Sequence, residues 1–377
     1  MNLKYCTAGF LFACLAVNLQ AAPTSSEMAS FRVETVAEGL EVPWALAFLP
    51  DGSALVVERE LGKLHRLNPG SGELVPITGL PPMLRSGKIS AGLFDVRPHP
   101  DFARNRLLYL AYAEGTEEAS GLVVDRVRLA GNALEDRQRL FTATPRTSLK
   151  WHYGGRLAIT GGYLYITTGD GYDHSAQSQA LDSHLGKILR LHDDGSIPDD
   201  NPFRDRRGAL PEIYAYGVRN PQGMAVHPKT GAIWINEHGP QGGDEINLIR
   251  SGVNYGWPVI TYGEEYGGGP IGDGIQRQAG LAQPVYYWVP SIAPSGLTFY
   301  EGSAFPDWEG SLFSGALALK HVNRLAVEEE RVMHEERLLA DRDWRVRFVE
   351  VDSSGHLYFG VDAGKILRLV PEASAPE

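Results

Sequence analysis

The sequence places one histidine where a general base could act. His152, one of 11 histidines, comes just before Gly154 and Gly155, and two successive glycines allow a ligand or a neighbouring strand to approach the backbone closely. An imidazole in such a loop exchanges protons near neutral pH. Asp170, in the turn formed by residues 167–171, would orient this imidazole if both loops reach one pocket. Each residue is also compatible with a purely structural role.

A glycine-rich segment, residues 236–247, carries oxygen groups suited to a hard cation. It reads Asn-Glu-His-Gly-Pro-Gln-Gly-Gly-Asp-Glu-Ile-Asn, and so combines acidic and amide side chains with accessible carbonyls. Ca²⁺ takes about six to eight oxygen ligands on flexible backbone. The segment is therefore either a calcium site or a solvated loop with ordinary acidic residues.

Two arginines near the C-terminus suggest recognition of an anion. Arg345 and Arg347 flank Val346, and side chains two residues apart lie on one face of a strand. Two parallel guanidinium groups suit a carboxylate or phosphate. Alternatively, they are exposed partners in surface salt bridges.

Repeated hairpin units predict the fold that positions these residues. With 43 Gly and 24 Pro the chain is dense in turns, and short apolar strands around a Pro/Asp/Gly turn recur at residues 45–58, 224–237 and 349–361. A second unit, Gly-Lys-apolar-x-Arg-Leu, recurs at residues 62–67, 186–191 and 364–369. Repeats of this kind are typical of propellers, whose blades bury their faces against each other. We expect an all-β, six-bladed β-propeller forming one catalytic domain over residues 30–371, with residues 22–30 and 372–377 disordered.

The first 22 residues predict a secretory signal peptide. Lys4 precedes a short apolar run, and the small residues Ala21 and Ala22 mark the expected cleavage site. Both cysteines, Cys6 and Cys14, fall in this leader, so the mature chain would contain no disulfide and no thiolate metal site. We expect an exported periplasmic protein without a membrane span.

The charge balance excludes two classes of partner. A formal net charge of −11 disfavours nucleic acid and anionic membranes, since both attract basic surfaces. Clustered arginines in such an acidic chain indicate a local anionic ligand instead.

Several of these segments together resemble the glucose/sorbosone dehydrogenase family, and within it the soluble aldose sugar dehydrogenases that use pyrroloquinoline quinone (PQQ). The resemblance covers nearly the whole mature chain. It rests on Arg-Asn-Pro-Gln-Gly at residues 219–223, on Gly-Pro followed by Gly-Gly-Asp-Glu at residues 239–245, and on Asn-Tyr-Gly-Trp-Pro at residues 254–258. It implies a propeller that holds PQQ and Ca²⁺ at one end of its central channel.

The resemblance also implies a role for each matching residue. His152 would be the base that removes a hydroxyl proton, supported by Asp170. Arg219 would stabilise the quinone oxygen that gains charge, so it is both a catalytic and a cofactor-binding candidate. The further cofactor contacts would be Asn220, Tyr266, Lys320, Arg345 and Arg347. The calcium ligands would be the carbonyls of Gly239 and Pro240 beside the cofactor, with Glu245 and Tyr255 at a further calcium.

One position departs from the family pattern. Where relatives carry glutamine before Gly-Gly-Leu, this chain has Ser90, which removes an amide contact to the cofactor. The expected reaction is oxidation of an aldose at C1 to the lactone, with the hydroxyl proton passing to His152 and a hydride to the quinone. The motifs do not specify the aldose, the electron acceptor or the oligomeric state.

Two other functions fit parts of the pattern. A calcium-dependent propeller lactonase or esterase would use the metal to polarise a carbonyl, but would give the Arg345/Arg347 pair no task. A non-catalytic propeller that binds a protein or glycan would account for the departure at Ser90 as lost cofactor binding.

Overall fold

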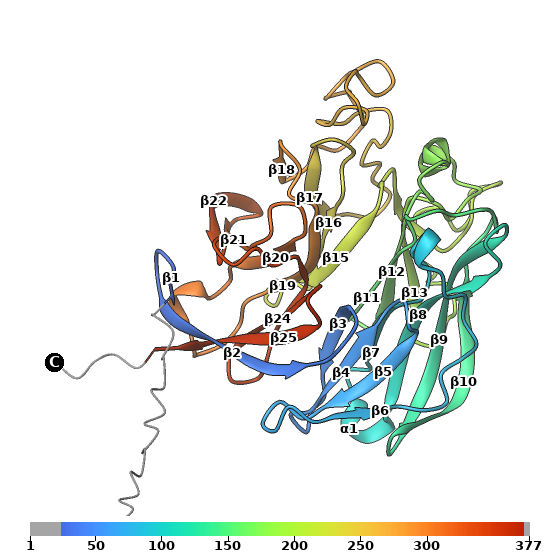
Figure 1. Cartoon of the computed structure of the whole chain (residues 1–377). Coiled ribbons are helices and arrows are strands. Elements are labelled where there is room, and N and C mark those ends of the chain that lie inside the picture. Colours follow the sequence, from blue (N-terminus) through green and yellow to red (C-terminus); the bar gives the residue numbers. More distant parts are fainter. Residues whose placement is uncertain (1–23, 373–377) are drawn as a thin grey trace, which may run out of the picture.

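The computed structural model describes residues 24–372 and folds them into six β-sheets arranged in a ring (Figure 1). The predicted all-β, six-bladed propeller is confirmed. The predicted signal peptide, residues 1–22, lies outside the described residues. Within residues 24–372 no helix has the length and apolar character needed to cross a membrane.

Blades 1 to 5 are antiparallel sheets whose strands follow chain order, and blade 6 adds strands from the N-terminal end of the described chain. Blade 1 comprises β3 (Pro43–Phe48), β4 (Ala54–Glu58), β5 (Lys63–Leu67) and β6 (Leu74–Pro76). Blade 2 comprises β7 (Leu93–Pro98), β8 (Leu107–Gly115), β9 (Ser120–Ala130) and β10 (Ala133–Thr142). Blade 3 comprises β11 (Gly154–Thr160), β12 (Tyr163–Thr168), β13 (Lys187–His192) and β14 (Ile213–Tyr216).

The second half of the chain forms the other three blades. Blade 4 comprises β15 (Pro221–Val226), β16 (Ile233–Glu237), β17 (Asp244–Ile249) and β18 (Tyr286–Trp288). Blade 5 comprises β19 (Pro294–Phe299), β20 (Leu312–Ala316), β21 (Val322–Glu328) and β22 (Arg331–Leu338). Blade 6 comprises β23 (Val346–Val351), β24 (Leu357–Val361), β25 (Lys365–Pro371), β2 (Ser30–Glu38) and β1 (Thr24–Ser25). The described helices are short, namely α1 (Phe102–Asn105) and the 3₁₀ turns η1 (Gly87–Ile89), η2 (Ser175–Gln179) and η3 (Pro306–Trp308).

The N-terminal strand closes the ring. Strand β2 pairs antiparallel with β25, so blade 6 is built from both ends of the described chain. The expectation of disorder at residues 22–30 is wrong for β1, because Thr24 and Ser25 pair with Phe31 and Ser30. The backbone N–H of Glu27 also donates to Glu336 on blade 5 at 2.6 Å, which fixes this segment against the neighbouring blade.

The sequence repeats fall on equivalent strands of different blades. The hairpin repeats form the two innermost strands of blades 1, 4 and 6, and the Gly-Lys repeats form the third strand of blades 1, 3 and 6. Buried aliphatic and aromatic side chains fill the space between adjacent blades. All six innermost strands, β3, β7, β11, β15, β19 and β23, run in the same direction along the channel, so their first residues meet at one end.

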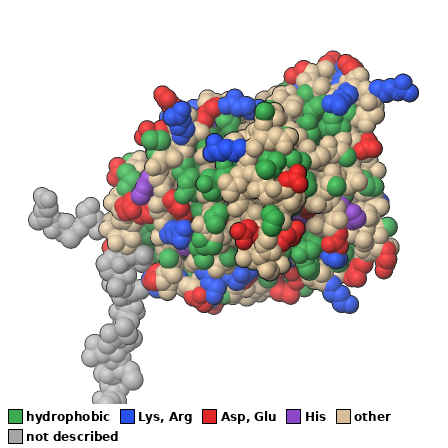
Figure 2. All heavy atoms as spheres, turned by 90° about the horizontal axis from the view of Figure 1, so that it is seen from above, with side chains coloured by type: hydrophobic (Ala, Val, Ile, Leu, Met, Phe, Trp, Pro, Cys, Tyr) green, Lys and Arg blue, Asp and Glu red, His purple; other side chains and the backbone are tan. Residues whose placement is uncertain are grey.

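Charged side chains on the surface are mixed in sign. On the face shown in Figure 2, lysine and arginine side chains are scattered among acidic and hydrophobic ones. This distribution agrees with the formal net charge of −11.

Candidate active site

The predicted site residues gather at the channel end where the innermost strands begin. His152 precedes β11, Arg219 and Asn220 precede β15, and Arg347 lies at the start of β23. Because neighbouring blades contribute one loop each to this end, residues far apart in sequence face a common space.

His152 and Asp170 form a buried hydrogen-bonded pair. His152 Nδ1 lies 2.6 Å from Asp170 Oδ1, and their side chains are 8% and 1% exposed. Burial lowers the pKa of His152 below its usual 6.5, although the contact with Asp170 acts in the opposite direction. The pKa of Asp170 is lowered despite its burial, because His152 and Arg219 favour the carboxylate. The pair therefore consists of a neutral imidazole oriented by an ionised carboxylate, with Nε2 without a hydrogen-bond partner in the described chain.

Three further contacts hold Asp170 in place. Trp257 Nε1 donates to Asp170 Oδ2 at 2.8 Å, and the backbone N–H of Tyr172 donates to Oδ1 at 2.9 Å. The backbone N–H of Asp170 donates to the carbonyl of Arg219 at 2.8 Å. A carboxylate with this many donors cannot rotate freely, so the plane of the imidazole is fixed as well.

Arg219 joins the histidine pair to the glycine-rich segment. Its Nη1 donates to the carbonyl of Gly239 at 2.8 Å and to that of His238 at 3.1 Å. Its guanidinium lies 5.2 Å from the centre of the Trp257 ring. Arg219 Nε is buried without a protein partner, which leaves one donor of a buried cation unsatisfied. Asn220 is also buried, with Oδ1 accepting from Gln222 Nε2 at 3.0 Å.

Two carboxylates lie beside each other next to Arg219. Glu237 on β16 is the cross-strand partner of Glu245 on β17, and Asn247 Nδ2 donates to both at 3.0 Å. Burial raises the pKa of both glutamates, and the charge of Glu237 raises that of Glu245 further. Asn247 Oδ1 is buried and has no hydrogen-bond partner among the residues that the structure describes. Glu237 and Asn247 were not among the residues predicted from the sequence; Asn247 lies two residues after Glu245 on β17, and Glu237 joins them through the pairing of β16 with β17.

A small cavity adjoins this carboxylate pair. Its volume is about 10 Å³, which is close to the minimum that holds one water molecule or ion. The residues that line it include Arg219, Glu237, Gly239, Glu245 and Tyr255. Tyr255 is 5% exposed, and its hydroxyl donates to the carbonyl of Leu248 at 2.6 Å. Gly239, predicted at the calcium beside the cofactor, thus lines the same cavity as Glu245 and Tyr255, predicted at a further calcium. Pro240 follows Gly239 directly. Within residues 24–372 no three His, Cys, Asp or Glu side chains form a metal-binding cluster, so a cation here depends on carbonyl and amide oxygens as well.

Arg345 and Arg347 lie on one face and share an acidic partner. Arg345 Nε lies 2.8 Å from Asp362 Oδ2, and Arg347 binds both oxygens of Asp362. The side chain of Arg345 is 44% exposed, whereas that of Arg347 is 15% exposed. Lys320, in the turn after β20, pairs instead with Asp343 at 2.6 Å. Arg345 Nη1 donates to Leu317 in the same turn, which brings Lys320 to this side of the channel.

Three arginines converge on Trp44, and two of them were not predicted. The guanidinium carbons of Arg59, Arg347 and Arg156 lie 3.8, 4.8 and 5.6 Å from the Trp44 ring. Burial, together with the charge of Arg347, lowers the pKa of Arg59 to about 10, although the hydrogen bond to Glu60 acts in the opposite direction. Arg59 Nε has no partner within the described residues. These three cations come from three different blades, so no sequence spacing could have revealed the cluster.

His238 lies between these groups. Its Nε2 contacts the carbonyl of Pro294 at 2.7 Å, and burial together with the nearby His152, Arg219 and Arg347 lowers its pKa to about 3. His238 is therefore neutral.

Two predicted features lie at the edge of this space. Tyr266 is 62% exposed in the long segment between β17 and β18 that rises above the blades (Figure 1). The structure does not bring it into contact with the other candidates.

Ser90, the position that departs from the family pattern, directly follows η1. Three residues later, the backbone N–H of Leu93 at the start of β7 donates to the carbonyl of Arg59. The departure therefore adjoins the arginine cluster.

Comparison with known proteins gives consistent matches over the whole described propeller. Residues 40–368 match the model of the glucose/sorbosone dehydrogenase family. An aldose sugar dehydrogenase of Escherichia coli, YliI, is 42% identical over 95% of this chain and 96% of its own. The crystal structure of the soluble aldose sugar dehydrogenase from Escherichia coli in its apo form superposes with a TM-score of 0.86, at 41% identity, over 91% of this chain and 100% of that one. The PQQ-bound aldose sugar dehydrogenase of Streptomyces coelicolor superposes with a TM-score of 0.73, at 28% identity, over 91% and 99%.

Proposed function

Because the chain belongs to the glucose/sorbosone dehydrogenase family, we propose that it oxidises the C1 hydroxyl of aldose sugars to the lactone with PQQ and Ca²⁺. The chain is an oxidoreductase of the PQQ-dependent aldose sugar dehydrogenase type. The observation that carries the proposed chemistry is the buried His152–Asp170 pair beside a group of buried arginines.

The residues present fit a polyanionic quinone. PQQ carries three carboxylates, and the channel end offers Arg59, Arg219 and Arg347, which are buried or nearly so. Arg59 pairs with Glu60 and Arg347 with Asp362, whereas Arg219 has no acidic ion-pair partner in the described chain. A buried cation without such a partner favours an anionic ligand, since a charge removed from water must be paired. The unsatisfied Nε atoms of Arg59 and Arg219 are donors that such a ligand could engage.

The neighbouring cavity fits a calcium ion. Glu237 is buried and Glu245 is partly buried, and the two are cross-strand partners, so each raises the cost of ionising the other unless a cation lies between them. The unpartnered Asn247 Oδ1 and the Gly239 carbonyl are further hard oxygens of the kind Ca²⁺ prefers. We propose that the carbonyls of Gly239 and Pro240 hold the calcium beside the cofactor. We propose that Glu245 and Tyr255, with Glu237 added, hold a further calcium.

The chain's own residues then have distinct tasks. His152 Nε2 accepts the proton of the sugar hydroxyl, and Asp170 fixes the ring so that Nε2 faces the substrate. The guanidinium of Arg219 would lie beside the quinone oxygen that gains negative charge during the reaction and would stabilise that charge. Arg347, Arg345 and Lys320 bind and orient the cofactor, with Asn220 as an amide contact. When bound, PQQ supplies the two-electron acceptor that no side chain can provide.

Reconstitution tests this proposal against its rivals. The purified protein is incubated with PQQ and Ca²⁺, and both dye reduction with aldoses and hydrolysis of lactones are measured. Sugar-dependent dye reduction that requires PQQ is the expected result. Lactone hydrolysis without PQQ would instead establish a propeller lactonase, and loss of both activities with intact folding would indicate a binding module.

We also propose export to the periplasm. The support is the leader predicted at residues 1–22, with the mature propeller spanning residues 30–371. N-terminal sequencing of protein recovered from the periplasmic fraction should begin close to Ala22. An intact Met1 in cytoplasmic protein would contradict this.

A further inference from the structure

A second cavity lies at the opposite end of the channel. Its volume is about 550 Å³, within the range of sites for small organic ligands. All six innermost strands contribute to it near their last residues, such as Phe48 on β3, Pro98 on β7 and Phe299 on β19. The candidate active site lies where the same strands begin, and between the two ends the channel narrows to a void of about 10 Å³ beside Arg97 and Arg156. The second cavity is therefore a separate site.

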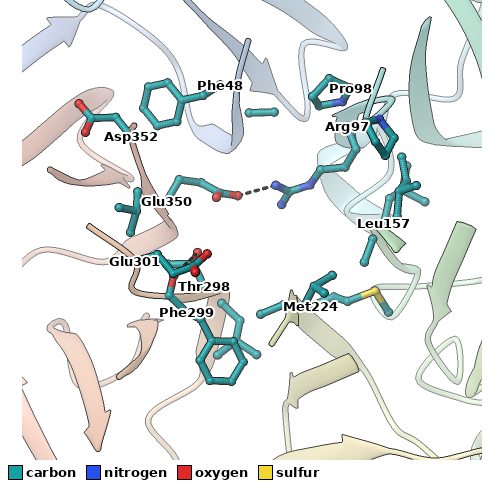
Figure 3. Close-up of a pocket in the computed structure, with 18 of the residues that line it drawn as sticks. Phe48, Arg97, Pro98, Leu157, Met224, Thr298, Phe299, Glu301, Glu350 and Asp352 are labelled. Carbon is teal, nitrogen blue, oxygen red and sulfur yellow. Dashed lines mark hydrogen bonds and ion pairs between the residues drawn. The ribbon is translucent and has the colours of Figure 1, made fainter. Parts of the chain in front are cut away.

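An ion pair crosses this cavity. Arg97 on β7 and Glu350 on β23 approach from opposite sides and meet at 2.6 Å in its centre (Figure 3). Their side chains are 23% and 16% exposed, so the pair is accessible from the cavity. Asp95, fully buried behind Arg97, contacts it at 3.3 Å. Arg97 is thus already neutralised by two carboxylates and attracts little further anion.

Two more carboxylates lie on the same wall as Glu350. Figure 3 shows Glu301 and Asp352 on the Glu350 side of the cavity. Asp352 is engaged by backbone N–H groups and by His356 Nδ1, whereas Glu301 has no hydrogen-bond or ion-pair partner in the described chain. The Oε2 atom of Glu350 is also without a partner there. The wall therefore carries uncompensated negative charge.

The other walls are apolar. Leu157 and Met224 lie on the side opposite the carboxylates, and the rings of Phe48 and Phe299 lie at the two edges between them (Figure 3). Aromatic faces attract cations as well as apolar groups. A complementary ligand has one cationic end for the acidic wall and an apolar body for the rest.

We propose that this second cavity binds a primary amine that carries an apolar body. The ammonium group donates hydrogen bonds to Glu301 and to the free oxygen of Glu350. The apolar body packs against Leu157, Met224 and Phe299. Binding here requires neither PQQ nor Ca²⁺, because no residue of the first site lines the cavity.

Calorimetric titration of the full mature protein tests this, with and without PQQ and Ca²⁺. The probe is 2-phenylethylamine, compared with its neutral analogue 2-phenylethanol and with anionic phenylacetate. We expect saturable binding of 2-phenylethylamine and no binding of the two analogues. The affinity for the amine should be the same with and without PQQ and Ca²⁺. Glu301→Gln should weaken it by about tenfold, the effect of one charged hydrogen bond. Glu301 makes no contact on which folding depends.

A matched control removes the same charge elsewhere. Glu328 is exposed near the end of β21, outside the cavity, and Glu328→Gln should leave amine binding unchanged. Three results would overturn the proposal: no binding of the amine, equal binding of the neutral analogue, or equal losses in both glutamine variants. Loss of amine binding only when PQQ is present would place the amine at the first site instead.

Discussion

His152 Nδ1 and Asp170 Oδ1 lie 2.6 Å apart, although 18 residues separate them in sequence. Trp257 holds the second oxygen of the same carboxylate from another blade. The imidazole is consequently fixed with its other nitrogen, Nε2, available for proton transfer. This relationship determines what the variants below should do.

Asp170→Asn should slow turnover without preventing cofactor binding. The amide can no longer pair with His152 as an ionised acceptor, so the imidazole loses both its orientation and its charge stabilisation. We expect a fall in kcat smaller than that of removing His152 itself. Trp257→Phe, which removes the hydrogen bond to Asp170 Oδ2 and keeps an aromatic ring beside Arg219, should give a still smaller fall. Equal kcat in Asp170→Asn and the unchanged protein would contradict a positioning role for Asp170.

Chelation of calcium should abolish dye reduction and lower the melting temperature. Without a cation, the neighbouring carboxyl groups of Glu237 and Glu245 lose the positive charge that permits both to ionise. Calcium that binds only the folded state raises its stability by mass action. Added Ca²⁺ should restore both properties, and Glu245→Gln should reduce the calcium-induced rise in Tm. If dye reduction and Tm both stay unchanged after exhaustive chelation, the proposed calcium site is wrong.

The two arginines of β23 should contribute unequally to PQQ binding. Each charged hydrogen bond contributes roughly 1.5–3 kcal/mol, so replacing both by Ala should weaken binding by several kcal/mol. Because Arg347 is less exposed than Arg345 and contacts Trp44, Arg347→Ala should cause the larger loss. A PQQ titration followed by absorbance measures this. Unchanged affinity in the double variant would place the pair on the outer surface.

Arg59 should bind the cofactor although the sequence analysis did not select it. Its guanidinium lies 3.8 Å from the centre of the Trp44 ring, and its buried Nε has no partner within the described residues. Arg59→Gln should therefore weaken PQQ binding, while the variant still folds into the same propeller. Arg66→Gln, at the exposed end of the same blade, is the control and should bind normally. Equal affinities would assign Arg59 to packing alone.

These results show why part of the site follows from the sequence and part does not. The repeats at residues 45–58 and 364–369 predict the blades because each repeat is a local hairpin or strand. The Arg345/Arg347 face follows from strand alternation. In contrast, the Trp44 cluster joins side chains from three blades, and the Glu237–Glu245 pair depends on the register between β16 and β17, which no local pattern records.

The role of His152 is tested most directly by His152→Ala in protein loaded with PQQ and Ca²⁺. Because a positioned base contributes about 10²- to 10⁴-fold, kcat should fall by this factor while PQQ affinity and Tm stay near those of the unchanged protein. Burial lowers the pKa of His152, so the unchanged enzyme should lose activity only as pH falls below about 6.5, when the imidazole becomes protonated. The residual activity of the variant should lack this acidic limb. Near-normal turnover in folded, PQQ-loaded His152→Ala would contradict the account.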